Sequence, residues 1–347
     1  YCKALKEAGG FPFVINLHSS FITPQKFCYS GRYEGIPFYY VQKSIMFETD
    51  PVRRNINKVK GWIRAFVIIQ RLREKNNIKI LFFSAGTSNE ILFSLGLKIL
   101  RIPVLRECNE APLFIRYDRK YVKLNKFFLG LRFKLFDRII VISDYLYNFY
   151  SGLYPAGRIF RIPILVDMDR FKNLKKNGID SKKEIVYVGN ISGEKDGLGD
   201  LIEAMAIVRK EIKNVKLILV GSSNEDDIIR LKIKISGLDL DDIVIFTGSK
   251  NAEEIPQILA DSDLLVLARP DNSQAKAGFP TKLGEYLASG RPVVITTTGE
   301  IPRYLVDKES AYLAKPGDIN DFASSVTYAL KDLNAIRIGE AGRNVAD

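Results

Sequence analysis

The chain has 347 residues, about twice the length of an ordinary domain, so we expect two domains. Hydrophobic residues make up 46% of the chain and charged residues 27%, a balance that excludes a disordered or fibrous protein. Three cysteines and one histidine, His18, are too few for a disulfide framework or a His-based metal centre, and they indicate a cytoplasmic protein. Polar and charged residues interrupt the most apolar region, 80–105, so no membrane-spanning helix is expected.

The net charge of +12 is unevenly distributed. Residues 1–172 carry 29 Lys and Arg against 13 Asp and Glu, a net charge of +16, whereas residues 173–347 carry 23 against 27, a net charge of −4. This concentration of positive charge indicates that the first half faces a polyanion or an anionic membrane. No recognition motif accompanies the charge, so we expect no nucleic-acid partner.

Apolar runs alternate with helical patterns in the first half, which predicts βαβ units and a mainly parallel sheet. Strands are expected at 11–17, 36–41, 78–84, 103–107, 138–142 and 158–164, and helices at 1–8, 55–75, 89–100 and 116–136. Because Tyr1 and Asp347 both lie inside helical patterns, we expect a fragment that lacks the first strand of this domain and the last helix of the next.

The densest basic run is 116–138, in which apolar residues recur at helical spacing. The recurring residues are Tyr117, Tyr121, Leu124, Phe128, Leu131 and Leu135. One interpretation is a surface helix that packs this stripe on its own domain, and another is a helix that also touches anionic lipid at the inner face of the membrane.

A polar, charged segment at 173–183 is predicted to be a linker, after which the alternation restarts. Strands are expected at 184–190, 215–221, 243–247, 263–268, 292–297 and 311–314, with helices at 198–211, 252–260 and 280–288. The predicted fold class is therefore α/β, with two Rossmann-like doubly wound domains, 1–172 and 184–347, facing a cleft. The ligand is expected in this cleft, at the carboxyl ends of the strands.

Glycines follow the strand that begins at residue 184 and precede a helix. Gly189 would let the backbone approach a ligand, Asn190 follows it, and Lys195 could reach a diphosphate near the helix N-terminus. Ordinary turn chemistry would also explain these glycines. After a later strand, the backbone at Gly248 could contact a nucleobase.

Segment 278–294 carries the most constraints together. Pro280 opens a helix, so backbone N–H groups near Thr281 and Lys282 would face the preceding Gly278–Phe279 loop with positive potential. Glu285, one turn later, could bind both hydroxyls of a ribose or only cap its own helix.

These segments resemble the retaining glycosyltransferases of family 4, which have the GT-B fold. The resemblance rests on Gly189, Glu194–Lys195, Ile202–Met205, segment 278–294, Gly299–Pro302, 311–318, 138–143 and 164–171. It implies a UDP- or GDP-sugar donor, a glycan or lipid-linked acceptor, retention of anomeric configuration, and a role in surface polysaccharide or glycolipid synthesis. By the same resemblance Lys195 and Lys282 bind the diphosphate and Glu285 the ribose. No metal is needed if these two lysines and backbone N–H groups stabilise the departing diphosphate.

Several positions depart from the family. Ala277 stands where the first of two paired glutamates is usual, Asn190 replaces an arginine, and the loop after 78–84 has no histidine. These departures leave open a degenerate donor-binding or scaffold protein, and a GT-B epimerase or phosphorylase.

The acceptor would bind to the first domain. Arg106, Glu107, Asn109 and Glu110 follow a predicted strand, and Glu110 could act as a base or orient the acceptor. A solvated loop in which the acidic residues balance nearby arginines explains this segment equally well.

Overall fold

The computed structural model describes residues 1–17, 28–42, 50–76, 78–83, 90–110, 112, 122–177, 182–192 and 196–347. The chain divides into two compact units, Tyr1–Arg106 with Lys134–Asp137, and Glu107–Phe133 with Arg138–Asp347. The bounds predicted from sequence, 1–172, 173–183 and 184–347, stay a prediction.

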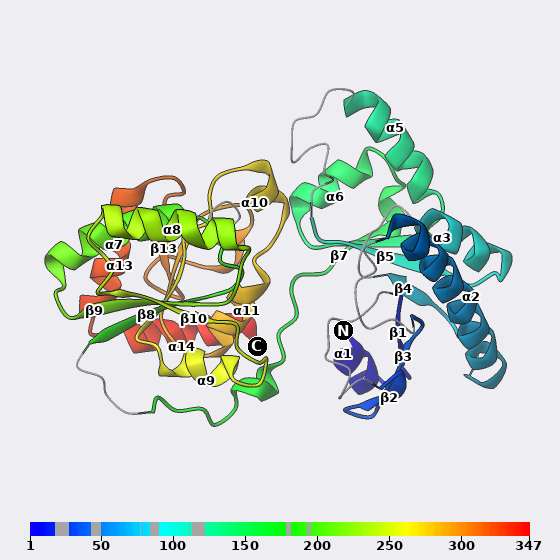
Figure 1. The fold of residues 1–347 in the computed structure, drawn as a ribbon, viewed down its shortest axis with the longest axis horizontal. Helices are drawn as coiled ribbons and strands as arrows, with labels where there is room; N and C mark the ends of the chain where they lie inside the picture. The colour runs from blue at the N-terminus through cyan, green and yellow to red at the C-terminus, as the bar shows by residue number, and fades with distance from the viewer. Residues whose placement is uncertain are drawn as a thin grey trace. The chain divides into compact units, whose positions relative to one another are not determined.

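Two sheets occur in the first half of the chain (Figure 1). One has the order β4-β5-β6-β7, formed by β4 (Leu81–Phe83), β5 (Val104–Cys108), β6 (Arg138–Val141) and β7 (Ile159–Arg161). The pairs β4–β5 and β6–β7 are parallel, as the alternating pattern predicts. The described residues of this part include the helices α1 (Cys2–Glu7), α2 (Pro51–Asn76), α3 (Glu90–Ile99), α5 (Val122–Phe133) and α6 (Asp144–Ser151).

The second sheet includes a hairpin that the sequence did not predict. β1 (Val14–Asn16) pairs in parallel with β3 (Ile36–Tyr40), but β2 (Ser30–Tyr33) pairs antiparallel with β3. Glu34 and Gly35 join these strands with φ of 49° and 76°, the positive values that a two-residue type I′ turn requires. Every residue of β2 is exposed, so no apolar alternation marks it as a strand.

The buried side of α5 also differs from the predicted stripe. Phe128 and Leu131, two members of the stripe, are exposed. Phe133 and Phe136, which lie outside it, are buried, and the ring of Phe133 packs against that of Tyr150 with centroids 4.8 Å apart. The stripe is therefore not the packing face along this part of the helix.

A six-stranded parallel sheet organises the second half of the chain, with the order β10-β9-β8-β11-β12-β13. Its strands are β8 (Lys183–Val188), β9 (Val215–Val220), β10 (Val244–Gly248), β11 (Leu264–Leu267), β12 (Val293–Thr296) and β13 (Tyr312–Ala314). All six were predicted, with small differences at their ends. This sheet confirms the predicted α/β class.

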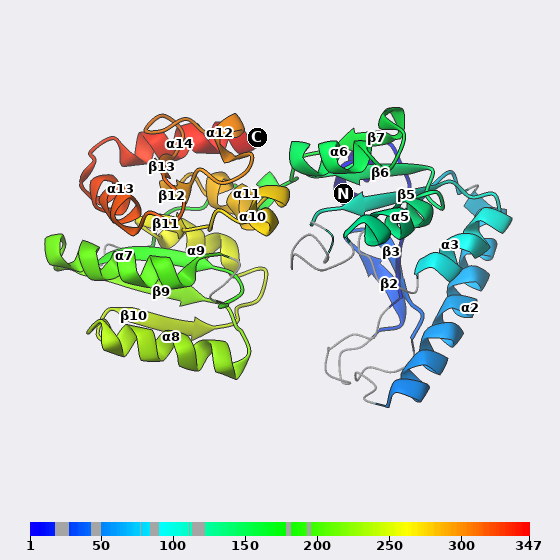
Figure 2. The same ribbon diagram turned by 90° about the horizontal axis from the view of Figure 1, so that it is seen from above.

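Helices cover both faces of this sheet (Figures 1 and 2). The helices on one face are α7 (Leu198–Glu211), α8 (Glu225–Gly237) and α13 (Ile319–Lys331). The other face carries α9 (Ile255–Asp261), α11 (Thr281–Ala288) and α14 (Ala335–Ala346). Short helices α10 (Ser273–Ala277) and α12 (Ile301–Tyr304) follow β11 and β12, and 3-10 turns lie at Ala156–Arg158 and Met168–Phe171.

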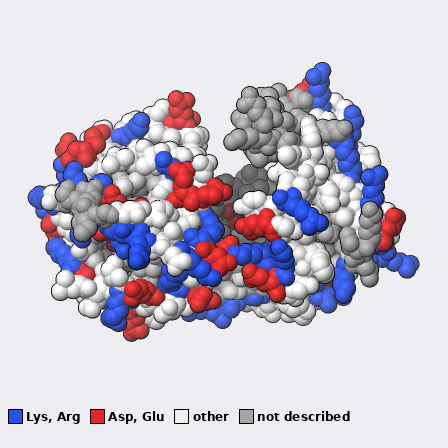
Figure 3. Space-filling view, turned by 90° about the horizontal axis from the view of Figure 1, so that it is seen from below, with Lys and Arg blue, Asp and Glu red and all other residues white. Residues whose placement is uncertain are grey.

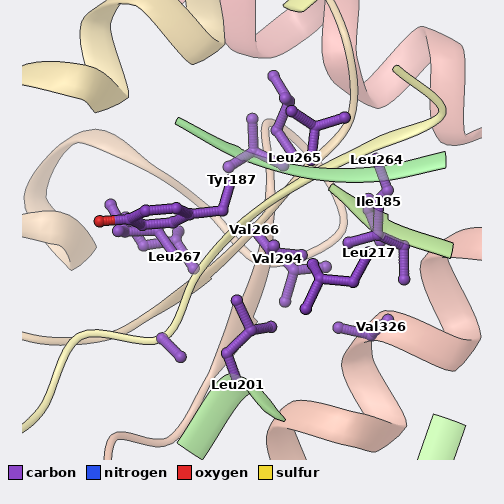
Figure 4. Close-up of a cluster of buried hydrophobic side chains, with 14 of the residues drawn as sticks. Ile185, Tyr187, Leu201, Leu217, Leu264, Leu265, Val266, Leu267, Val294 and Val326 are labelled. Atoms are coloured by element: carbon purple, nitrogen blue, oxygen red, sulfur yellow. The ribbon is translucent and has the colours of Figure 1, made fainter. Parts of the chain in front are cut away.

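The core of this half lies between the sheet and its helices. Ile185, Leu217 and Leu264 are fully buried on neighbouring strands, and Leu201 and Val326 pack onto them from α7 and α13 (Figure 4). The ring of Tyr187 belongs to this cluster, but its hydroxyl points away from the other labelled side chains (Figure 4). A rigid, apolar sheet therefore supports one polar group at the carboxyl end of β8.

Candidate functional site at the ends of β8 and β11

The strand order fixes where a ligand can bind to the six-stranded sheet. In chain order the strands read 3-2-1-4-5-6, so the connections leave β8 and β11 in opposite directions. In doubly wound sheets, the gap beyond the carboxyl ends of two such strands binds ligands because no connection crosses it. The site is therefore expected beyond Val188 and Leu267.

Gly189 follows β8 and lies against Lys282 from the start of α11. A Cβ added to Gly189 would lie 2.1 Å from Lys282 Nζ and 2.8 Å from the Tyr187 hydroxyl. Any side chain at position 189 would therefore displace the lysine. The structure thus brings together two of the residues predicted for the donor, although they are far apart in sequence.

Lys282 is held by a buried polar cluster. Its Nζ lies 2.5 Å from Asp196 Oδ2, donates to the Tyr187 hydroxyl at 2.8 Å, and sits 4.4 Å from the centroid of the Tyr187 ring. The Tyr187 hydroxyl in turn lies 2.8 Å from Asp196 Oδ2. The side chains of Lys282 and Asp196 are only 16% and 8% exposed, so solvent screens their interaction weakly.

Burial and charge act in opposite directions on Asp196. Burial disfavours its ionised form, but the Lys282 ammonium and hydrogen bonds from Lys282 and Tyr187 outweigh burial and lower the pKa of the carboxyl. Burial, reinforced by the Asp196 charge, raises the pKa of Tyr187, which stays protonated. The cluster therefore contains a fixed carboxylate, a neutral phenol and a lysine ammonium.

Backbone geometry at Gly197 positions Asp196. Gly197 caps the N-terminus of α7 with φ of 67°, and a Cβ there would lie 1.8 Å from the carbonyl oxygen of Ala268. Only glycine fits this left-handed position so close to another backbone. The start of α7 and the residue after β11 are thereby held together.

Arg269 adds a second cation to this end of the sheet. It follows β11 and is only 2% exposed. Its Nη2 donates to the Ala275 carbonyl at 3.2 Å, but its buried Nε and Nη1 have no hydrogen-bond partner. Burial lowers the pKa of Arg269, whereas the Asp196 charge raises it. A guanidinium with two unsatisfied buried donors can donate hydrogen bonds to an anionic oxygen.

The N-terminus of α11 is held beside β8. Tyr286, fully buried, accepts a hydrogen bond from the Val188 backbone N–H at 2.7 Å. Pro280 occupies the N-cap position, no side chain caps the helix, and its first turn contains no acidic residue. The partial positive charge of this terminus is therefore not neutralised by its own first turn.

The residues on either side of Pro280 lie in different environments. Thr281 is exposed, and Phe279 packs edge-to-face on Tyr304 with ring centroids 5.4 Å apart. Gly278 ends α10, and a Cβ there would lie 3.9 Å from Arg269 Nη2.

Glu285 is paired with a residue that the sequence analysis did not select. Its Oε1 lies 2.5 Å from Nη1 of Arg170, in the 3-10 turn Met168–Phe171, and both side chains are about one-third exposed. Arg170 also donates to the Ala252 carbonyl at 2.5 Å. Ribose binding by Glu285 stays a prediction.

The other predicted donor residues have separate roles in the fold. The Asn190 carbonyl accepts from the Tyr187 hydroxyl at 2.9 Å, while Gly248 has φ of 73° at the end of β10. Ala277, at the position of the usual glutamate, is fully buried in α10. Lys195 and His18 lie outside the described residues.

The predicted acceptor residues lie at and beyond the end of β5. Arg106 and Glu107 are in the strand, where Glu107 is buried and the Arg106 guanidinium stacks 5.2 Å from the Phe136 ring centroid. Asn109 and Glu110 follow the strand, and the Asn109 side-chain oxygen is buried without a hydrogen-bond partner. Their acceptor role stays a prediction.

Sequence reasoning missed Tyr187, Asp196, Arg269 and Arg170. Tyr187 occupies a strand position that reads as core, and Asp196 reads as one more polar residue of a loop. Arg269 carries the clearest available signal, a charge directly after the uninterrupted apolar run of β11. In the described part of the chain, no three His, Cys, Asp or Glu residues lie close enough together to hold a metal ion.

Comparisons with known proteins show what the second half of the chain is similar to. Residues 182–332 match the family model described as Glycosyl transferases group 1. The chain is 31% identical over 179 residues to N-acetyl-alpha-D-glucosaminyl L-malate synthase of Bacillus anthracis, covering 51% of this chain and 44% of the relative. It is 29% identical over 173 residues to the amylovoran biosynthesis glycosyltransferase AmsK of Erwinia amylovora, covering 49% and 41%.

The fold is also found in solved structures. Anabaena HepE in complex with UDP-glucose superimposes with a TM-score of 0.68 at 18% identity, covering 90% of this chain and 81% of that one. The chain therefore has the two-domain α/β architecture of GT-B glycosyltransferases. The matched stretch spans less than half the length of the two curated relatives.

Proposed function

We propose that the chain, whose residues 182–332 match the family model described as Glycosyl transferases group 1, transfers a sugar from a nucleotide-sugar donor to a glycan or lipid-linked acceptor. The observation that carries this proposal is the convergence of Gly189, Asp196 and Lys282 at the switch point of the sheet. This arrangement offers a cation and a helix N-terminus, beside a residue without a side chain, where the donor diphosphate would bind.

The chemistry of the leaving group explains why such a site would catalyse transfer. Breaking the bond between sugar and diphosphate leaves negative charge on the departing nucleotide. Lys282, Arg269 and the N-terminus of α11 would stabilise this charge because they are fixed before the reaction. Asp196 would hold the Lys282 ammonium in place until the diphosphate competes for it.

Retention of the anomeric configuration and independence from metal ions are part of the proposal. Retention follows from the resemblance of segments 186–205 and 278–294 to retaining enzymes. Metal independence follows if Lys195, Lys282 and backbone N–H groups stabilise the departing diphosphate. An NMR assignment of the anomeric proton in the first product would test retention, and activity in excess EDTA would test metal independence.

UDP-sugars are the donors we propose first, because a GT-B structure of similar fold holds UDP-glucose. A polysaccharide or its lipid-linked precursor is the proposed acceptor class, supported by the relative that acts in amylovoran biosynthesis. The exposed Phe127, Phe128 and Leu131 of the basic α5 are compatible with the predicted membrane contact of 116–138. No helix in the described residues is both long and apolar enough to cross a bilayer.

Thermal unfolding with UDP, GDP and ADP tests donor binding directly. At 100 times its dissociation constant, a bound nucleotide should add about 2.7 kcal/mol to the free energy of unfolding. The double variant Lys282→Met, Asp196→Asn removes both charges together. We expect it to bind the nucleotide at least ten-fold more weakly, so that the nucleotide adds less to its free energy of unfolding.

Lys331→Met is the matched control, because Lys331 also forms an ion pair, at 2.8 Å with Glu211, but on α13. We expect its nucleotide shift to equal that of the wild type. If none of the three nucleotides shifts unfolding, the proposed donor site is wrong. If UDP binds but UDP-sugar is never hydrolysed or transferred with any glycan acceptor, the chain is a binding protein.

A further inference from the structure

Helix α2 presents an apolar stripe to solvent. Five β-branched residues, each between 44% and 67% exposed, form it: Val52, Ile56, Val59, Ile63 and Val67. At about 100° per residue they fall within an arc of about 80°, so they form one continuous row rather than scattered contacts. The opposite side of the helix carries its buried residues Gly61, Ala65 and Ile69. The stripe is therefore a second apolar face of α2, separate from the face that packs on the protein.

The stripe is flanked by positive charge. Residues 51–76 contain eight Lys and Arg and one acidic residue, a net charge of +7. The exposed Arg53, Lys60 and Arg71 line one side of the row. In Figure 3, basic side chains are spaced along the upper right edge, where α2 lies, with uncharged surface between them. The row ends where Gln70 hydrogen-bonds to Glu74 at 3.0 Å.

We infer that this face of α2 docks on an anionic lipid surface. The aliphatic row would enter the boundary between headgroups and acyl chains, while the flanking cations contact lipid phosphates. Charge selects this occupant over a second copy of the chain, since two helices of net charge +7 would repel each other. A nucleic acid would leave the apolar row unused.

This surface is distinct from the predicted contact through 116–138, and it does not depend on the donor site. α2 belongs to the unit formed by Tyr1–Arg106 and Lys134–Asp137, whereas α5 belongs to the other unit. Vesicle binding and nucleotide binding can therefore be measured separately, and either can fail without the other.

Co-sedimentation with vesicles tests the inference. At about 0.1 M salt, the 347-residue chain should bind phosphatidylcholine vesicles that contain phosphatidylglycerol, and bind pure phosphatidylcholine at least ten-fold more weakly. The variant Ile56→Glu, Ile63→Glu should lower binding to the anionic vesicles at least ten-fold, because both carboxylates would enter the interface. Lys60→Gln, Arg71→Gln should lower it by about five-fold per charge removed.

The chain offers a matched control on α8. Ile229 and Ile233 are 49% and 68% exposed one turn apart, on a helix with three basic and three acidic residues. Ile229→Glu, Ile233→Glu should leave vesicle binding unchanged. Trp62, the only tryptophan, lies in α2 and should be quenched by brominated lipid in the wild type but not in the Ile56, Ile63 variant.

Three results would overturn the inference. Equal binding by the wild type and the Ile56, Ile63 variant would exclude α2 as the contact. Equal binding to neutral and anionic vesicles would remove the role of charge. A wild-type dimer without vesicles that the same variant dissociates would show that a second copy covers the stripe. If the variant Ile56→Glu, Ile63→Glu does not fold, the variant Lys60→Gln, Arg71→Gln tests the inference in its place.

Discussion

Asp196 is the residue on which the candidate site depends most. Its carboxylate is buried, paired with Lys282 at 2.5 Å, and hydrogen-bonded by Tyr187. Removing one partner of a buried ion pair costs about 3–5 kcal/mol because the other charge is left without compensation. We therefore expect Asp196→Asn to destabilise the fold by about that amount at neutral pH, measured by urea unfolding.

The same pair predicts how stability depends on pH. Because the folded pKa of Asp196 is lowered below the ordinary value of 3.8, its contribution is present above about pH 3.8 and is lost as the pH falls further. Asp196→Asn should therefore flatten the loss of stability below pH 4. Asp242→Asn, at an exposed carboxylate paired with Arg209 at 2.6 Å, should cost about 1 kcal/mol or less. Equal effects of the two changes would contradict a buried ion pair.

Arg269 should show opposite effects on stability and binding. Its buried Nε and Nη1 lack partners, so Arg269→Met removes an unsatisfied charge and should leave the free energy of unfolding unchanged or raise it. If this guanidinium binds the donor, the same change should weaken UDP binding about ten-fold or more, measured by calorimetry. An unchanged UDP affinity would remove Arg269 from the site.

At the scale of elements, the backbone at Gly197, where α7 begins, is tightly constrained. Gly197→Ala would place a methyl group 1.8 Å from the Ala268 carbonyl at a φ of 67°. The left-handed conformation alone costs about 1–2 kcal/mol for a non-glycine residue, and the clash adds to this cost. We expect a fall in the melting temperature. Gly157→Ala, with no atom within 4 Å of the new Cβ, should cause little change.

The elements also show how far the sequence could predict this molecule. Helix 198–211 and the six strands of the second sheet were predicted because each combines an apolar period with turn residues at its ends. β2 was missed because its four residues are all exposed and it is defined by pairing with β3. The local sequence pattern therefore predicts elements that bury one face. It does not predict a strand such as β2, which is defined only by its pairing with a neighbouring strand.

The site was predictable to a similar extent. Gly189 and Lys282 were selected from separate segments, and the structure brings them into contact. Asp196 and Arg269 were not selected, because what distinguishes them is burial close enough to interact, one before the N-terminus of α7 and the other after β11. A lone aspartate in a loop carries no sign that a lysine 86 positions later will pair with it.

At the scale of the whole molecule, calorimetry should separate the two units of the chain. A bound nucleotide stabilises only the unit that contains its site. UDP should therefore raise the unfolding temperature of the unit that includes Arg138–Asp347 and leave the transition of the other unit in place. A shift of both transitions by the same amount would show that the units unfold together.

The pairing of β8 with β11 has a consequence for biosynthesis. These strands are neighbours in the sheet although about 80 residues separate them, and Lys282 follows later still. A nascent chain that has emerged only as far as β10 already contains Gly189 and Asp196, yet it lacks the lysine that neutralises the carboxylate. Nucleotide capture on the ribosome should therefore begin abruptly, after α11 has left the exit tunnel, and would report the completion of folding.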